Sequence, residues 1–176
     1  MKAGGEGFFA AVDTHPYQPR GVLIGQATDD SCVPACVRML LLDEFPHLAD
    51  DYRLSESCLR NALETTSKGS SVAGVPAVLR EMGMARPYIF RADLTLPELR
   101  RTAAGGTVMA VLRTIFPQAA HVVLVEEVTE TGVAVRDPLP LGQGSAYTVA
   151  LSEFMAAWAS ALSDLGCAVI SARIKI

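Results

Sequence analysis

The spacing of apolar residues along the chain changes near residue 106. Before that point, apolar residues recur with the spacing of one helix face. The predicted helices lie at 32–45, 55–65, 72–82 and 96–103. After it, short β-branched runs are separated by turns that contain Gly, Pro or Thr, as is typical of strands. The predicted strands lie at 107–113, 121–128, 132–136 and 145–150, before a helix from Ser152 to about Ser163 and a strand within 167–176.

Local signals indicate where two of these helices begin. Pro34 is tolerated only in the first turn of a helix, which places the first helix start at Cys32,. The residues that can cap this helix are Asp29, Asp30 and Ser31,. Thr95, with Glu98 three residues later, predicts a capping box for the helix at 96–103,.

The order of elements, helices first and strands second, indicates the α+β class. We predict an N-terminal helical part on one side of a mostly antiparallel β-sheet, with the functional cleft between the two parts. Residues 1–21 are rich in Gly and Pro and lack a sustained period, so we expect an N-terminal arm with little chemistry of its own,. A single domain is expected over 22–176, a length that fits one compact unit,.

Composition and charge narrow the class of protein. Half of the 176 residues are hydrophobic, enough for a buried core without disulfides or a metal,. The net charge of -4 and the scatter of Lys and Arg argue against nucleic-acid binding,. The apolar run near the N-terminus is too short for a signal segment, and no run reaches the roughly 20 residues of a membrane span. We therefore expect a cytoplasmic protein with no membrane span.

The cysteines give no sign of a metal site. Cys32 and Cys36 form a Cys-x3-Cys pair, but no second pair or nearby histidine completes a four-ligand set,. Cys36, Cys58 and Cys167 are predicted to be core residues, since a free cysteine behaves as a small apolar side chain. Neither a metal nor a cofactor is expected.

Cys32 is the candidate nucleophile because it stands at a predicted helix start. The positive end of the helix dipole favours the thiolate, which is the reactive form of cysteine. A neighbouring imidazole must then accept the proton and return it. Of the three histidines, His121 opens a predicted strand, whereas His15 lies in the arm and His47 lies more than a helix length from Cys32. His121 is therefore the candidate base.

Two further residues complete the predicted site. Asp137 closes a predicted strand, and a hairpin turn at 129–132 would return it beside His121 to orient the ring,. Gln26, six residues before Cys32, can join the Cys32 N–H as the second donor of an oxyanion hole,. Each of these residues alone is more often structural, so the prediction rests on their joint order and spacing.

Residues 26–40 resemble the Gln-x5-Cys helix entry of the C39-type peptidases, the bacteriocin-processing family that cleaves double-glycine leaders. The Ala-Ala-His121 strand and the Val-Arg-Asp137-Pro turn, with His and Asp sixteen residues apart, match that family's His strand and Asp-Pro turn. The segment 152–158 also resembles the family's helix after that turn.

This resemblance implies a papain-like cysteine peptidase fold with Cys32, His121 and Asp137 as catalytic triad and Gln26 at the oxyanion hole. It implies a peptide or protein substrate, namely a precursor whose leader ends in small residues such as Gly-Gly. It also implies association with a membrane exporter. Val33 stands where many members of the family have glycine after the nucleophile.

The sequence is also compatible with two other functions. A papain-fold transferase or deamidase would use the same acyl-enzyme site on another acceptor. A non-catalytic module would hold a leader peptide without cleaving it. The substrate sequence and the oligomeric state are not determined by these patterns.

Overall fold

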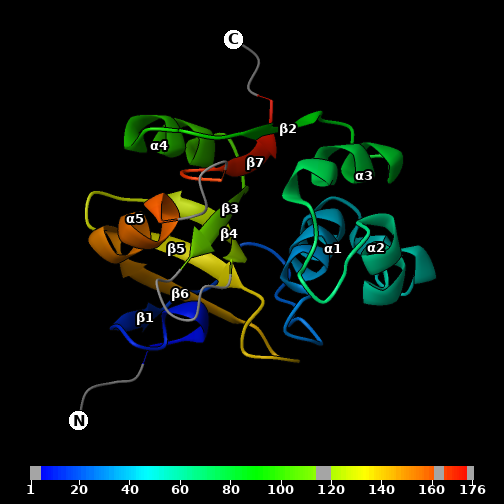
Figure 1. The fold of residues 1–176 in the computed structure, drawn as a ribbon, viewed down its shortest axis with the longest axis horizontal. Coiled ribbons are helices and arrows are strands. Elements are labelled where there is room, and N and C mark those ends of the chain that lie inside the picture. Colours follow the sequence, from blue (N-terminus) through cyan, green and yellow to red (C-terminus); the bar gives the residue numbers. More distant parts are fainter. Residues whose placement is uncertain (1–4, 114–119, 161–164, 174–176) are drawn as a thin grey trace.

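The computed structural model describes residues 5–113, 120–160 and 165–173, which form one seven-stranded sheet with all neighbouring strands antiparallel (Figure 1). The strand order is β1-β6-β5-β4-β3-β7-β2. The strands are β1 Thr14–Pro16, β2 Tyr88–Arg91, β3 Val108–Arg113, β4 Ala120–Val128, β5 Gly132–Asp137, β6 Ser145–Ala150 and β7 Val169–Ala172. The α+β class and the antiparallel sheet are confirmed.

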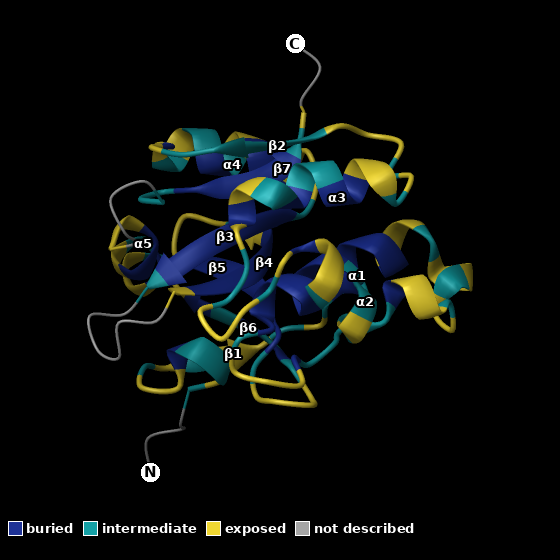
Figure 2. Cartoon of the chain, turned by 45° about the vertical axis from the view of Figure 1, so that its right-hand side comes forward, coloured by how far each residue is buried: buried dark blue, intermediate teal, exposed yellow. Residues whose placement is uncertain are grey.

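Helices cover both faces of this sheet. In the described residues they are α1 Cys32–Glu44, α2 Glu56–Ala62, α3 Val75–Glu81, α4 Leu96–Ala104 and α5 Leu151–Ala159. Val122 and Leu124 of β4 join the core under α1, α2 and α3, whereas Val123 and Val125 join a second core under α4 and α5. The expectation of helices on one side only was wrong, because the central strands are apolar on both faces and each face needs a cover. Figure 2 shows these strands and most of α1 as buried.

Several local predictions are confirmed. Helix α1 begins at Cys32, and the Thr95 and Glu98 pair forms the capping box of α4, with the Thr95 N–H donating to Glu98 Oε2 at 2.8 Å. The β4–β5 turn closes at 129–132, where the N–H of Thr129 donates to the carbonyl of Gly132 at 2.9 Å. Helix α5 ends at Ala159, and residues 161–163 of its predicted range lie outside the described residues.

Two edge strands were not predicted from the sequence. Strand β1, in the arm, pairs with β6, and strand β2 pairs with β7. Both are too short to show a period of two, so only their pairing partners make them strands. The end of the predicted C-terminal strand, 174–176, lies outside the described residues.

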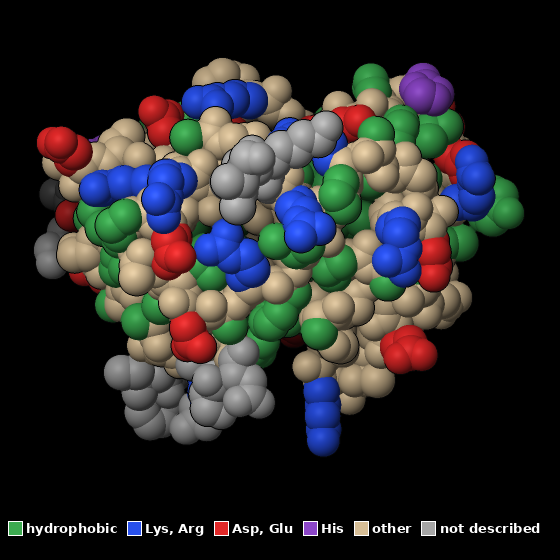
Figure 3. All heavy atoms as spheres, turned by 90° about the horizontal axis from the view of Figure 1, so that it is seen from above, with side chains coloured by type: hydrophobic (Ala, Val, Ile, Leu, Met, Phe, Trp, Pro, Cys, Tyr) green, Lys and Arg blue, Asp and Glu red, His purple; other side chains and the backbone are tan. Residues whose placement is uncertain are grey.

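Charged side chains are interspersed on the face shown in Figure 3. Lys and Arg side chains there are spread among acidic and uncharged ones rather than gathered in one patch, as their scatter along the sequence suggests. In the part of the chain that the structure describes, no helix has both the length and the apolar character needed to cross a membrane.

Candidate active site

Cys32 is the first residue of α1 and lies where this helix meets the sheet. Its side chain is 8% exposed and lines a cavity of about 210 Å³. The other walls come from Val33, the loop 68–73 and Val111 and Val122 of β3 and β4. Cys32 therefore faces a cavity between the helical part and the sheet, large enough to admit part of a peptide.

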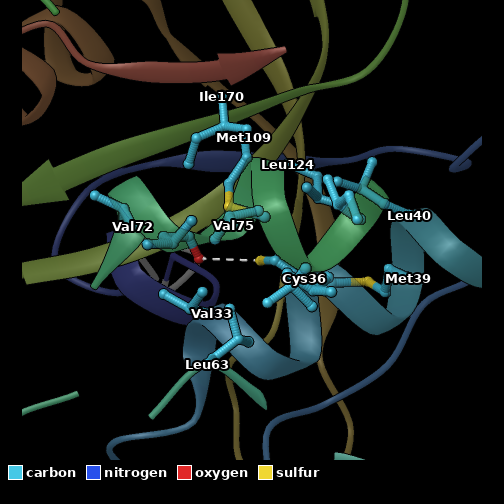
Figure 4. Close-up of a cluster of buried hydrophobic side chains, with 14 of the residues drawn as sticks. Val33, Cys36, Met39, Leu40, Leu63, Val72, Val75, Met109, Leu124 and Ile170 are labelled. Carbon is cyan, nitrogen blue, oxygen red and sulfur yellow. Dashed lines mark hydrogen bonds between the residues drawn. The ribbon is translucent and has the colours of Figure 1, made fainter. Parts of the chain in front are cut away.

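The other cysteines differ from Cys32 in their surroundings. Cys36 is fully buried in the first core, and its thiol donates to the carbonyl of Val122 at 3.5 Å (Figure 4). Burial raises the pKa of the Cys36 thiol, which keeps it protonated,. The prediction that Cys36 is core is confirmed, and Cys167 is half-buried against the second core. Cys58 is half-buried and belongs to neither core cluster, so the core prediction was wrong for it.

The N-terminus of α1 has no side-chain cap. Ser31 occupies the N-cap position, but its hydroxyl bonds within the preceding loop, donating to the carbonyl of Thr28 at 3.0 Å. The same hydroxyl accepts the N–H of Thr28 at 3.1 Å. As a result, the positive end of the helix dipole at Cys32 is not offset by a capping oxygen.

His121 and Asp137 are hydrogen-bonded to each other. The register of the β4–β5 hairpin sets Leu124 opposite Arg136, so Asp137 lies diagonally across from His121 on the same sheet face,. His121 Nε2 and Asp137 Oδ1 are 2.7 Å apart, and both side chains are buried. Because Nε2 is engaged with Asp137, Nδ1 is the ring nitrogen left to face another partner.

Burial disfavours the charged form of His121, but its partners outweigh that effect. The hydrogen bond to Asp137, then the hydrogen bond and charge of Cys32, raise the pKa of His121 from 6.5 to about 9,. The thiol of Cys32 is thus close enough to the imidazole to interact with it, which brings three of the four predicted site residues together.

Gln26 is buried in the loop that precedes α1. Its Nε2 donates to the carbonyl of Thr28 at 2.7 Å, and one of its two amide protons remains for another acceptor,. Its backbone is tied to the turn after Asp137, with its N–H donating to the Pro138 carbonyl at 2.8 Å. Its Oε1 is buried without a hydrogen-bond partner among the described residues.

Two residues of this site were missed in the sequence. The hydroxyl of Tyr147 donates to Asp137 Oδ2 at 2.6 Å, and the N–H of Phe8 donates to the same oxygen at 2.8 Å. Tyr147 lies on a predicted strand, where a polar aromatic at an inward position was the available signal. Phe8 belongs to the arm, whose lack of pattern gave no signal for this contact.

The chain belongs to the Peptidase C39 family, whose family model matches residues 21–163. The sheet with a helix-borne cysteine facing a strand-borne histidine is thus a C39 peptidase domain of the papain-like class. A comparison with curated proteins gives no match. Among the residues that the structure describes, no group of three or more His, Cys, Asp or Glu could hold a metal ion.

Solved structures share this fold at low sequence identity. A putative C39-like peptidase from Bacillus anthracis is 13% identical, with a TM-score of 0.61 over 89% of this chain and 99% of that chain. The peptidase domain of Streptococcus ComA, a bi-functional ABC transporter involved in a quorum sensing pathway, is 16% identical. Its TM-score is 0.58 over 86% of this chain and 98% of that chain. A double glycine motif protease from an AMS/PCAT transporter, in complex with the leader peptide, is 11% identical. Its TM-score is 0.52 over 91% of this chain and 97% of that chain.

Proposed function

We propose that the chain is a cysteine peptidase in which Cys32, His121 and Asp137 form the catalytic triad. The observation that carries this proposal is the buried 2.7 Å contact between His121 Nε2 and Asp137, which leaves Nδ1 for the neighbouring Cys32. A raised His121 pKa favours the imidazolium, the partner that a reactive thiolate needs,.

In this mechanism the Cys32 sulfur attacks the carbonyl carbon of the scissile peptide bond. The oxyanion accepts hydrogen bonds from the Cys32 N–H and from the free Nε2 proton of Gln26. The His121 imidazolium gives its proton to the leaving amine, which departs and leaves a thioester on Cys32. A water, deprotonated by His121, then attacks the thioester and releases the carboxylic acid. Asp137 keeps the ring oriented through both steps.

The proposed substrate is a precursor peptide whose leader ends in small residues. This choice is supported by the family and by the structural likeness to a double glycine motif protease. The cavity beside Cys32 is walled by apolar side chains, including Val72 and Leu165, with Lys68 and Ser70 also lining it. A peptide whose backbone passes Cys32 would place one residue into this cavity.

Two further features follow from the same proposal. The ComA and AMS/PCAT peptidases belong to transporters, so we propose that an exporter of the cleaved peptide is the partner of this chain. The reaction would then take place in the cytoplasm, where a catalytic thiol stays reduced. We also propose that 22–176 forms the peptidase domain and that 1–21 is an N-terminal arm joined to it.

The test uses Cys32→Ala with a leader-bearing precursor peptide, followed by mass spectrometry. Wild-type protein should yield two fragments whose masses sum to the precursor plus one water, and Cys32→Ala should yield none. Cys58→Ala is the matched control, since this half-buried cysteine lies on α2, and it should cleave like wild type. Undiminished cleavage by Cys32→Ala would refute the proposal, and modification without scission would point to a deamidase or transferase.

A further inference from the structure

The N-terminal arm folds back onto the His121–Asp137 pair. The Phe8 ring lies parallel to the His121 imidazole, with 5.3 Å between ring centroids and 8° between planes. The Phe8 N–H donates to Asp137 Oδ2 at 2.8 Å, across 129 positions of sequence. One residue therefore touches both members of the pair, through its ring and through its backbone.

The segment that carries Phe8 is anchored by the residues that follow it. Phe9 is buried in the second core, where its ring meets that of Tyr147 edge-on at 6.2 Å. A few residues later, β1 pairs with β6, with Pro16 opposite Tyr147. Because the anchors lie on the strand that also supplies the Tyr147 hydroxyl to Asp137, the position of Phe8 is tied to that of the carboxylate.

Gly7 lets the backbone come this close. Its φ of +53° lies in the left-handed region, and a Cβ built on it would overlap Asp137 Oδ2 and come within 2.9 Å of Ser145 Oγ,. Any larger residue at position 7 must push the turn away from the carboxylate. Glycine at position 7 therefore lets the Phe8 N–H approach Asp137 Oδ2.

A buried histidine–carboxylate bond is strongest where water is excluded and the ring is held in place. The Phe8 ring covers one face of the imidazole, and its N–H satisfies a lone pair of a fully buried carboxylate. The family model matches from residue 21 onward, so Phe8 precedes the residues that this model matches.

We propose that the segment Gly5–Phe9 is a working part of the active site, in which Phe8 is a positioning residue that holds His121 in line with Asp137 and Cys32. This inference rests on the proposed function, because it assigns Phe8 a role in the reaction of the same site. The segment does not line the cavity beside Cys32, so its role is argued from its contacts with His121 and Asp137.

The main test compares Phe8→Ala, Phe8→Leu and Phe8→Tyr. Loss of the ring should lower kcat roughly tenfold to a hundredfold with little change in KM, because misplacing a catalytic group by about 1 Å has an effect of this size. Phe8→Tyr keeps the flat ring and should restore most of kcat. Phe8→Leu keeps only apolar bulk and should stay slow, so it tests the ring even if Phe8→Ala folds poorly. Gly7→Ala should also lower kcat.

The alkylation rate of Cys32 by iodoacetamide at neutral pH is a second readout that needs no substrate. It should fall in Phe8→Ala, since a displaced imidazole stabilises the thiolate less. Phe45→Ala is the matched control: Phe45 is also half-buried, follows the C-terminal end of α1 and not the Cys32 end, and has its ring centroid 6.3 Å from that of His47. It should leave kcat and alkylation unchanged.

Three results would overturn the proposal: unchanged kcat and alkylation in Phe8→Ala, full rescue by Phe8→Leu, or an equal loss in Phe45→Ala. These results are distinct from failure of the peptidase proposal. If Cys32→Ala cleaved the peptide as fast as wild type, the proposed function would fail, while the alkylation rates would still report whether Phe8 positions His121.

Discussion

Asp137 accepts four hydrogen bonds although its side chain has no contact with solvent. His121 Nε2 and the N–H of Leu139 lie 2.7 Å and 2.9 Å from Oδ1, and Tyr147 and Phe8 donate to Oδ2. A buried carboxylate is costly unless such donors replace water. Because these donors come from β4, from the turn after β5, from β6 and from the arm, the orientation of this one side chain depends on four separate parts of the chain.

The raised pKa of His121 predicts how activity depends on pH. The imidazolium persists below its pKa. Because the pKa of His121 is near 9, the ring stays protonated in mildly alkaline solution, and kcat/KM should stay high there,. Activity should fall as pH rises through about 9. Replacing Asp137 by Asn removes the charge that raises the pKa, so the alkaline limb should move to lower pH and kcat should drop.

The measurement is kcat/KM between pH 5 and pH 10 for wild type and Asp137→Asn. Asp43→Asn, a carboxylate of α1 that contacts Arg136 and not His121, is the control and should keep the wild-type alkaline limb. An alkaline limb near the ordinary histidine value of 6.5 in wild type would contradict the raised pKa of His121.

At the scale of elements, Arg136 joins β5 to its neighbours. This fully buried guanidinium pairs with Asp43 of α1 at 2.6 Å and donates to the Val22 carbonyl at 2.7 Å. Its Nε lies 2.6 Å from Glu126 Oε1 of β4, as an ion pair without hydrogen-bond geometry. Glu126 in turn accepts the N–H of Arg20 at 3.0 Å. The network holds the arm, α1 and the site hairpin together.

We expect Arg136→Met to lower the free energy of unfolding by about 3–5 kcal/mol, because it leaves Glu126 buried without its counter-charge,. Urea unfolding followed by circular dichroism measures this change. Arg53→Met is the control: it breaks an exposed ion pair with Asp51 and should have little effect,. Equal loss in both variants, or none in Arg136→Met, would show that the buried network does not stabilise the fold.

The elements also show where local patterns suffice. The capping box at Thr95 is made by residues three positions apart, and the sequence predicted it correctly. Ser31 was predicted among the possible caps of α1 and does occupy that position, yet its hydroxyl turns back to Thr28. Propensity identifies residues that are able to cap a helix, but a competing partner decides which hydrogen bond forms.

The whole molecule has two apolar cores on opposite faces of one sheet. Strands β3 and β4 contribute alternate residues to both, so neither core can form without the strands that complete the other. Trp158 of α5, the single tryptophan of the sequence, is fully buried in the second core and donates to the Ala168 carbonyl at 3.0 Å. Its fluorescence therefore reports on one core, whereas far-UV circular dichroism also reports on the helices of the other.

We predict that the two signals give the same midpoint in urea, as for a cooperative two-state domain. The control is Leu59→Ala, which opens a cavity in the first core. It should lower the free energy of unfolding by about 2–5 kcal/mol and shift both urea midpoints down together,. If the circular dichroism signal were lost before the tryptophan signal, the helical part would be an independent unit and the shared-strand account would fail.

Much of the candidate site was predictable because its spacing is local. Pro34 and the apolar residues after it place Cys32 at a helix start, and the turn at 129–132 returns Asp137 to the strand of His121. These features depend on steric limits and hydrogen bonds between residues close in sequence. These local limits and bonds do not depend on where the segment packs in the fold.

Local sequence therefore determined the helices and the strands other than the edge strands β1 and β2, as well as the helix-tip cysteine and the histidine–aspartate hairpin. Only the tertiary structure decided which groups surround them: the second helical layer on the sheet, the Tyr147 hydroxyl on Asp137, and the Phe8 ring on His121. The physical reason is that such contacts depend on how packed surfaces fit across long sequence separations, and the spacing of residues within one element carries no information about its partner.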